Sequence, residues 1–142
     1  MRRKNMMKKI LFMLSMALAA VVGHAQEQFE GMWQCEALGA TMVLNLAEKN
    51  IALKDFEGED TYGYVKGDLN GTWVILKVKE VKDNKALVRM VSDIGHDAQD
   101  VELKLKKEGT LELKLVGEQN IKTIVKQKYV KLPKVSVFKK NE

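Results

Sequence analysis

Residues able to bind a metal ion gather in one segment, from Ser92 to Asp100. Its candidate ligands are Asp93, His96, Asp97 and Asp100. Carboxylates bind Ca²⁺ in loops whose acidic residues alternate in an Asp-x-Asp-x-Asn-Gly pattern, and that pattern is missing from this segment. We therefore interpret the segment as a solvated loop and predict no metal site.

The chain also has few side chains that could serve in nucleophilic or acid–base catalysis. Beyond residue 25 the sequence holds one cysteine, Cys35, and one histidine, His96. A catalytic triad or a zinc site needs several such side chains, and neither G-x-S-x-G nor H-E-x-x-H occurs. We predict that the protein is not an enzyme and has no cofactor. Cys35 is expected to be a small apolar core residue, and the alternative is a free thiol for intermolecular pairing.

Three aromatic side chains, Tyr62, Tyr64 and Trp73, flank the dipeptide Asn70-Gly71. An aromatic ring with a polar tip suits the mouth of a ligand cavity, because it offers both apolar area and a hydrogen-bonding group. The alternative is ordinary packing of aromatic side chains between strands. The Asn-Gly dipeptide itself predicts a tight hairpin turn, since both residues tolerate a positive φ.

The first 25 residues have the three-part layout of a secretory signal peptide. Five cations and no acidic residue occur in this segment, and an apolar run extends from Ile10 to Val22. Gly23 and Ala25 supply the small residues that precede a cleavage site. The apolar run of 13 residues is shorter than the about 20 needed to span a bilayer. We predict cleavage after Ala25, no transmembrane span in the processed chain, and a periplasmic or secreted location in a Gram-negative bacterium.

Cleavage would remove the net charge of the chain. Five of the 24 cations lie in the signal segment, which leaves 19 cations against 19 anions. A formally neutral chain has no general phosphate-binding footprint, so we predict no nucleic-acid partner. The charge is nevertheless divided, because residues 26–100 hold 8 cations and 14 acids, whereas residues 101–142 hold 11 cations and 5 acids. This division favours either pairing between the two ends of the chain or a basic face for an acidic ligand.

Apolar and polar residues alternate with period two along almost all of the chain after the signal segment. Such alternation is typical of antiparallel sheets with one packed face and one solvated face. In the segment 72–82 it places Val74, Leu76 and Val78 on one face of the strand. Nine strands are predicted, over residues 29–38, 41–47, 50–56, 61–69, 72–82, 85–92, 100–107, 110–117 and 121–132.

Short turns join these predicted strands, which indicates a meander of sequential hairpins. A meander of about eight to ten strands has no open edge when it closes into an up-and-down barrel, and a two-sheet sandwich is the competing arrangement. With one proline and no linker-like run, residues 26–142 are expected to form a single all-β barrel domain. The segment 133–142 is either a final strand or a loose tail.

Phe29, Gly31 and Trp33 give the pattern F-x-G-x-W at the start of the first predicted strand. This pattern resembles the first-strand motif of the lipocalins and the cellular fatty-acid-binding proteins, the calycin group. The resemblance implies that Trp33 points inward and plugs one end of a small bacterial lipocalin-like barrel beneath a cavity. It also implies a basic residue from a late strand that packs over the tryptophan. The candidates for this role are Lys126, Lys128 and Lys131.

Two functions fit such a barrel. The first is a non-enzymatic binding protein that holds a small apolar or amphipathic ligand in its interior, with Tyr62 and Tyr64 orienting a polar end of that ligand. The second is an interaction module, an inhibitor or an envelope component, with a filled interior and a surface that binds a protein partner. The residues expected to line a ligand cavity are Trp33, Met42, Leu44, Leu53, Tyr62, Tyr64, Leu76, Met90, Leu103 and Leu113.

Overall fold

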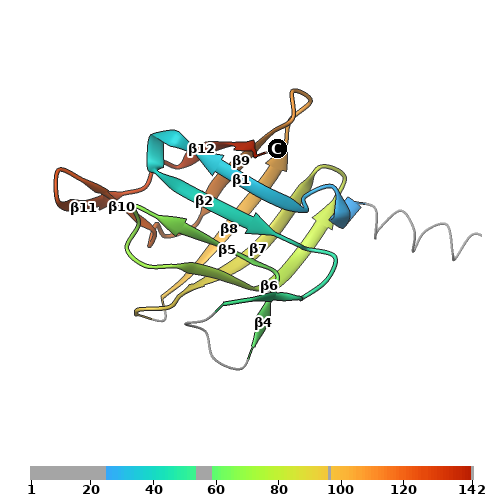
Figure 1. The fold of residues 1–142 in the computed structure, drawn as a ribbon, viewed down its shortest axis with the longest axis horizontal. Helices are drawn as coiled ribbons and strands as arrows, with labels where there is room; N and C mark the ends of the chain where they lie inside the picture. Colours follow the sequence, from blue (N-terminus) through green and yellow to red (C-terminus); the bar gives the residue numbers. More distant parts are fainter. Residues whose placement is uncertain (1–24, 54–58, 96, 142) are drawn as a thin grey trace, which may run out of the picture.

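The described part of the protein consists almost entirely of β-strands, twelve in number (Figure 1). The structure is a computed structural model that describes residues 25–53, 59–95 and 97–141. The predicted signal peptide, apart from Ala25, and His96 of the predicted loop lie outside the described residues. In these ranges no helix is both long enough and apolar enough to cross a bilayer.

Eight of the strands close into an antiparallel barrel in the order β1-β2-β5-β6-β7-β8-β9-β12, and β12 pairs back onto β1. The barrel strands are β1 (Gly31–Cys35), β2 (Ala40–Leu44), β5 (Gly63–Gly67), β6 (Trp73–Lys82), β7 (Lys85–Ser92), β8 (Ala98–Leu105), β9 (Thr110–Val116) and β12 (Val135–Lys140). A short 3-10 turn, Glu36–Leu38, joins β1 to β2. The predicted all-β meander closed into a barrel is confirmed.

Two short hairpins interrupt this meander. The first pairs β3 (Ile51–Ala52) with β4 (Asp60–Thr61), and the second pairs β10 (Lys122–Val125) with β11 (Lys128–Lys131). The prediction of one strand over 121–132 is wrong, because Lys126 and Gln127 adopt positive φ angles of 50° and 66° and reverse the chain. The predicted strand 50–56 contributes only β3 to the described structure. The segment 133–142 supplies the closing strand β12.

Two β-bulges change which residues of β6 point into the barrel. The pairing of β6 with β7 shifts register once after Ile75 and again after Val78. Each bulge inserts an extra residue, so the inward side chains no longer occupy strictly alternate positions. Leu76 is half-buried and lies outside the core cluster, so the predicted inward face is wrong at this residue. The side chains of β6 that join the core are Trp73, Ile75, Val78 and Val81.

Buried side chains cover both ends of the barrel. At the end where β1 begins, which we call the N-terminal end, Phe29 and Leu46 are buried. At the opposite end, which carries the β10–β11 hairpin and which we call the hairpin end, Leu69, Ile121 and Leu132 are buried. The Leu132 N–H donates a hydrogen bond to the Ile121 carbonyl at 3.1 Å and joins the two segments at the base of the hairpin.

Candidate functional site

Two contacts hold Trp33 in the middle of β1. Its indole Nε1 donates a hydrogen bond to the Phe29 carbonyl at 3.0 Å. The Lys140 ammonium Nζ lies 5.5 Å from the centroid of the Trp33 ring. Gly31 provides space for this lysine, because a Cβ at position 31 would lie 2.9 Å from Lys140 Cε. The residues of the F-x-G-x-W pattern therefore pack together with the last strand of the barrel.

The basic residue over Trp33 is Lys140, which pairs directly with Trp33 in the register between β1 and β12. The predicted candidates Lys126, Lys128 and Lys131 are exposed in the β10–β11 hairpin, so that prediction is wrong. The alternation of apolar side chains in the segment 135–138 was the available signal for a final strand.

Replacing Lys140 with alanine is expected to lower the free energy of unfolding by about 0.5–2 kcal/mol, because the cation–π contact and the alkyl chain over the indole are both lost. Lys139→Ala is the matched control, since Lys139 is the exposed neighbour on β12 and pairs with Gln34 and Thr110. Urea unfolding followed by tryptophan fluorescence measures both variants. Equal losses in the two variants would contradict the role assigned to Lys140.

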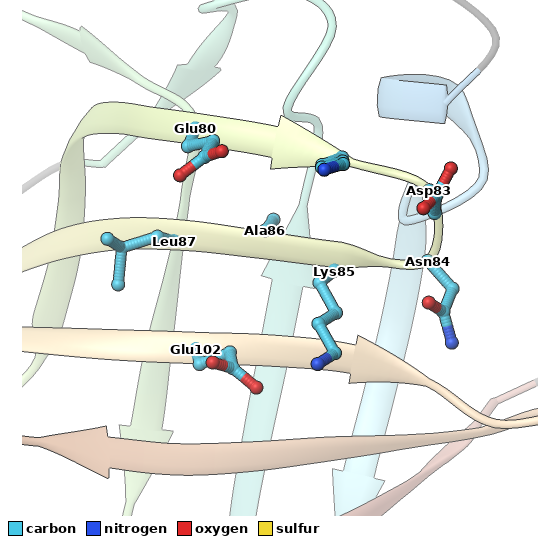
Figure 2. Close-up of a pocket in the computed structure, with 8 residues that line it drawn as sticks. Glu80, Asp83, Asn84, Lys85, Ala86, Leu87 and Glu102 are labelled. Carbon is cyan, nitrogen blue, oxygen red and sulfur yellow. The ribbon is translucent and has the colours of Figure 1, made fainter.

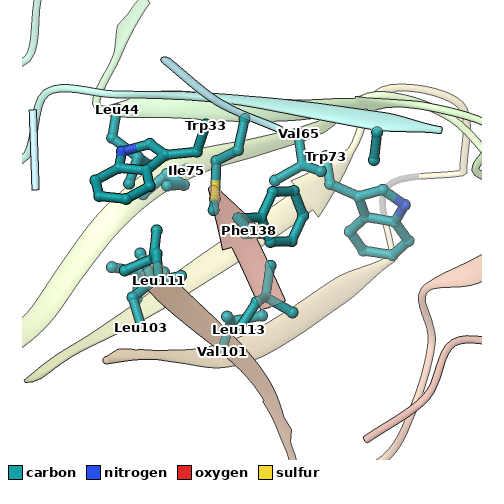
Figure 3. Packing of buried hydrophobic residues seen from close by; sticks show 14 of the residues in the cluster. Trp33, Leu44, Val65, Trp73, Ile75, Val101, Leu103, Leu111, Leu113 and Phe138 are labelled. Atoms are coloured by element: carbon teal, nitrogen blue, oxygen red, sulfur yellow. The ribbon is translucent and has the colours of Figure 1, made fainter. Parts of the chain in front are cut away.

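Six of the ten predicted cavity residues meet inside the barrel (Figure 3). They are Trp33, Met42, Leu44, Met90, Leu103 and Leu113. Their exposed fractions are 0–2%. A cavity large enough for a ligand would leave accessible surface on the side chains around it. The interior is therefore filled by protein side chains that pack against one another.

The two tyrosines do not share a cavity mouth. Tyr62 packs against the edge of the core cluster, and Lys49 Nζ lies 5.8 Å from its ring centroid. Tyr64 lies on the face of β5 opposite to buried Val65, and Lys66 Nζ lies 5.5 Å from its ring centroid. Each tyrosine therefore has the environment expected of a packed strand residue beside a lysine.

Leu53 and Leu76, the remaining predicted cavity residues, are half-buried and lie outside the core cluster. Leu53 directly follows β3, which belongs to the first short hairpin and not to the barrel. Leu76 directly follows the inward-facing Ile75 and so lies on the opposite face of β6, and the bulge that follows brings Val78 inward.

Among the described residues, four pockets have volumes of about 250–390 Å³, and one of them lies at the N-terminal end beside Leu46, Tyr62 and Val78. The largest, about 390 Å³, lies beside the turn between β6 and β7 (Figure 2). Its lining includes Glu80, Lys85 and Glu102 around the apolar side chains of Ala86 and Leu87. Such a hollow, lined mostly by charged groups, lacks the apolar enclosure that is typical of small-molecule sites.

Asp100 accepts hydrogen bonds from two cations on the outer face of the sheet. Lys79 Nζ and Arg89 Nε each lie 2.9 Å from a carboxylate oxygen of Asp100. The hydrogen bonds from Arg89 and from Lys79 hold the pKa of the Asp100 carboxyl below its ordinary value. A lowered pKa in the folded state stabilises the fold above the unfolded pKa, and this stabilisation is lost as the pH falls through the folded value.

Asp100→Asn is expected to lower the free energy of unfolding by less than about 1 kcal/mol near neutral pH, because the three side chains are partly exposed to water. Below the folded pKa of Asp100 the carboxyl is protonated in both states. The difference between the two proteins should therefore shrink as the pH is lowered. Urea unfolding at neutral and at strongly acidic pH measures this difference. A difference that grows towards acidic pH would contradict the assignment.

Asp93, in the loop between β7 and β8, has a structural partner. Asp93 Oδ1 accepts a hydrogen bond from the Thr72 N–H at 2.8 Å and so joins this loop to the start of β6. Among the residues that the structure describes, no group of three or more histidine, cysteine, aspartate or glutamate side chains is placed to hold a metal ion. Cys35 is buried in the core cluster beside the other inward side chains of β1.

Comparison of the chain with protein-family models, curated proteins and solved structures finds no match. The fold is established at the level of a closed antiparallel barrel of eight strands. A fold of this kind supports many unrelated functions, so the function has to be argued from the interior and the surface of this chain.

Proposed function

We propose that this protein is an exported interaction module of the cell envelope, a barrel with a filled interior that acts through its surface. The observation that supports this proposal most strongly is the near-zero exposure of the inward side chains. An eight-stranded barrel has an interior that side chains just fill or that holds one small ligand. Because Met42, Met90, Leu103 and Leu113 are at most 1% exposed, the first of these arrangements is favoured.

A calycin relationship forms part of the same proposal. It is supported by the F-x-G-x-W pattern, by the contact of Lys140 with Trp33 and by the meander of eight barrel strands. In calycin-type binding proteins a ligand would enter the barrel at one end. In this chain Ile121 and Leu132 are 2% and 4% exposed at the hairpin end, which favours a barrel without an entrance there. Export is supported by the signal-like composition of the first 25 residues.

Titration with an environment-sensitive fatty acid analogue tests the filled interior. The processed chain, residues 26–142, contains every described strand and is expected to show no saturable fluorescence change. Native mass spectrometry of the protein purified from its own envelope is expected to give the mass of the polypeptide alone. Leu113→Ala, titrated with benzene in place of the analogue, is the positive control, since an apolar cavity made in a packed core stays dry and binds small molecules such as benzene. Stoichiometric binding of the analogue that Leu113→Trp abolishes would restore the ligand-binding hypothesis.

A further inference from the structure

The β10–β11 hairpin projects from the hairpin end of the barrel (Figure 1). It exposes apolar side chains on both of its faces. Ile124, Val125, Tyr129 and Val130 are 41–59% exposed. The strand register places Ile124 beside Tyr129 on one face, whereas Val125 and Val130 share the other face. A flat protein surface would cover only one of these faces.

Four lysines accompany these apolar side chains. They are Lys122, Lys126, Lys128 and Lys131, all of them exposed. The sequence between residues 119 and 141 contains no acidic residue, although residues 26–142 together are formally neutral. The positive charge is therefore concentrated on one projecting element, and this indicates an anionic partner.

Hydrogen bonds join the base of the hairpin to the barrel. Asn70 Oδ1 accepts from Trp73 Nε1 and from the Lys122 N–H, both at 3.0 Å. Asn70 Nδ2 donates to the Asn120 carbonyl at 3.1 Å. Because Trp73 is itself fully buried, these bonds tie the hairpin to the core. The hairpin is thus oriented before it meets a partner, which reduces the entropic cost of binding.

We propose that the β10–β11 hairpin docks this protein on the surface of an anionic phospholipid bilayer. This inference rests on the proposed function, and it identifies an anionic bilayer as the partner that the barrel surface binds. Tyrosine and aliphatic side chains favour the membrane interface, and lysine side chains extend from it to anionic headgroups. The fluid interface of a bilayer can surround both faces of the two-stranded hairpin. An acidic protein would need a cleft that matches the hairpin in order to contact both faces. The two apolar faces therefore favour the bilayer.

Acidic residues also lie on the rim of the hairpin end. The acidic residues in the connections at this end are Glu36, Asp68, Asp93, Asp97 and Glu118. The strands of the hairpin are four residues long. The Ile124 N–H donates a hydrogen bond to the Asp68 carbonyl at 3.0 Å, so only the outer part of the hairpin, around Lys126 and Lys128, extends beyond the rim. This tip meets a bilayer first, and the repulsion from the rim weakens over the Debye length of about 8 Å at physiological ionic strength.

Vesicle binding tests the proposal with the processed chain. Tyr129→Trp places a reporter on the hairpin, and the native Trp33 and Trp73 are only 2% and 0% exposed. Vesicles that contain phosphatidylglycerol are expected to shift the emission of the new tryptophan to the blue and to sediment with the protein. Pure phosphatidylcholine vesicles should do neither. Raising the salt from about 0.05 M to 0.5 M should release the protein, because the attraction is screened.

Charge variants identify the hairpin as the element that binds. Each lysine near an anionic bilayer strengthens binding by about fivefold. Replacing the four hairpin lysines with glutamine is therefore expected to weaken vesicle binding by at least about 25-fold, the loss expected from Lys126 and Lys128 at the tip. The matched control replaces four exposed lysines elsewhere with glutamine and should change binding by less than about threefold, since those side chains are distant from the bilayer. The control positions are Lys77, Lys82, Lys85 and Lys107.

Three results would overturn the proposal: no binding of the unmodified protein to anionic vesicles, equal losses in the hairpin and control variants, or binding to polyglutamate but not to vesicles. The last result would assign the hairpin to an acidic protein partner. None of these results bears on the filled interior, which the fatty acid analogue tests separately. Circular dichroism should give the same melting temperature for the hairpin variant and the unmodified protein, because the substituted side chains are exposed.

Discussion

Trp33→Ala is expected to lower the free energy of unfolding by about 3–5 kcal/mol, the range for deleting a large buried aromatic side chain. Trp33 is 2% exposed, and its removal would leave a cavity inside a closed barrel. The barrel is hydrogen-bonded around its whole circumference, so it has little freedom to collapse into that space. Urea unfolding followed by the fluorescence of Trp73 and by circular dichroism measures the loss.

Trp33→Phe separates packing from the polar contact of the indole. Phenylalanine keeps an aromatic ring in the core but cannot donate to the Phe29 carbonyl, which the indole contacts at 3.0 Å. The expected loss is about 1–3 kcal/mol, from a buried acceptor left without its partner and from the smaller ring. A loss below about 1 kcal/mol for Trp33→Ala would show that Trp33 does not organise the core.

Gly63→Ala is expected to lower the free energy of unfolding by at least about 3 kcal/mol or to prevent folding, through backbone strain and broken strand pairing. Gly63 has a φ of +150°, a region that residues with a side chain rarely adopt. A Cβ at this position would overlap with the carbonyl oxygen of Val43 on β2. Because the obstacle is backbone, the alanine can be accommodated only if β2 and β5 move apart.

Gly109→Ala is the matched control for this substitution. Gly109 also has a positive φ, +84°, but a Cβ there meets no atom within 4 Å. The control should therefore lose only about 1 kcal/mol, the cost of the unfavourable backbone angle alone. Urea unfolding of both variants gives the comparison. Similar losses would show that close approach of β2 and β5 is not what requires glycine at position 63.

The period-two alternation was sufficient to predict the fold, because each barrel strand has one buried and one solvated face. The side chains of β9 illustrate this, with Leu111, Leu113 and Leu115 buried at alternate positions. The alternation could not reveal the bulges of β6. Its residues Trp73, Val74 and Ile75 are all apolar and all buried, so the pattern alone does not show which of them points inward.

The β10–β11 hairpin could not be predicted because its turn carries no turn signal. Lys126 and Gln127 occupy the positions of positive φ where asparagine and glycine are usual. The segment therefore resembled one continuous strand, and its lysines were assigned to the barrel interior over Trp33. The sequence left the segment 133–142 open between a final strand and a loose tail, since Pro133 precedes it and a proline cannot donate to a strand ladder.

The filled interior is the central claim, and a crystal of the processed protein under xenon pressure tests it most directly. Xenon occupies apolar cavities that water leaves empty. The account predicts no xenon density between Met42, Leu103 and Leu113 in the unmodified protein, and density at that place in a Leu113→Ala crystal. Xenon bound inside the barrel of the unmodified protein would contradict the claim and would point again to an interior ligand.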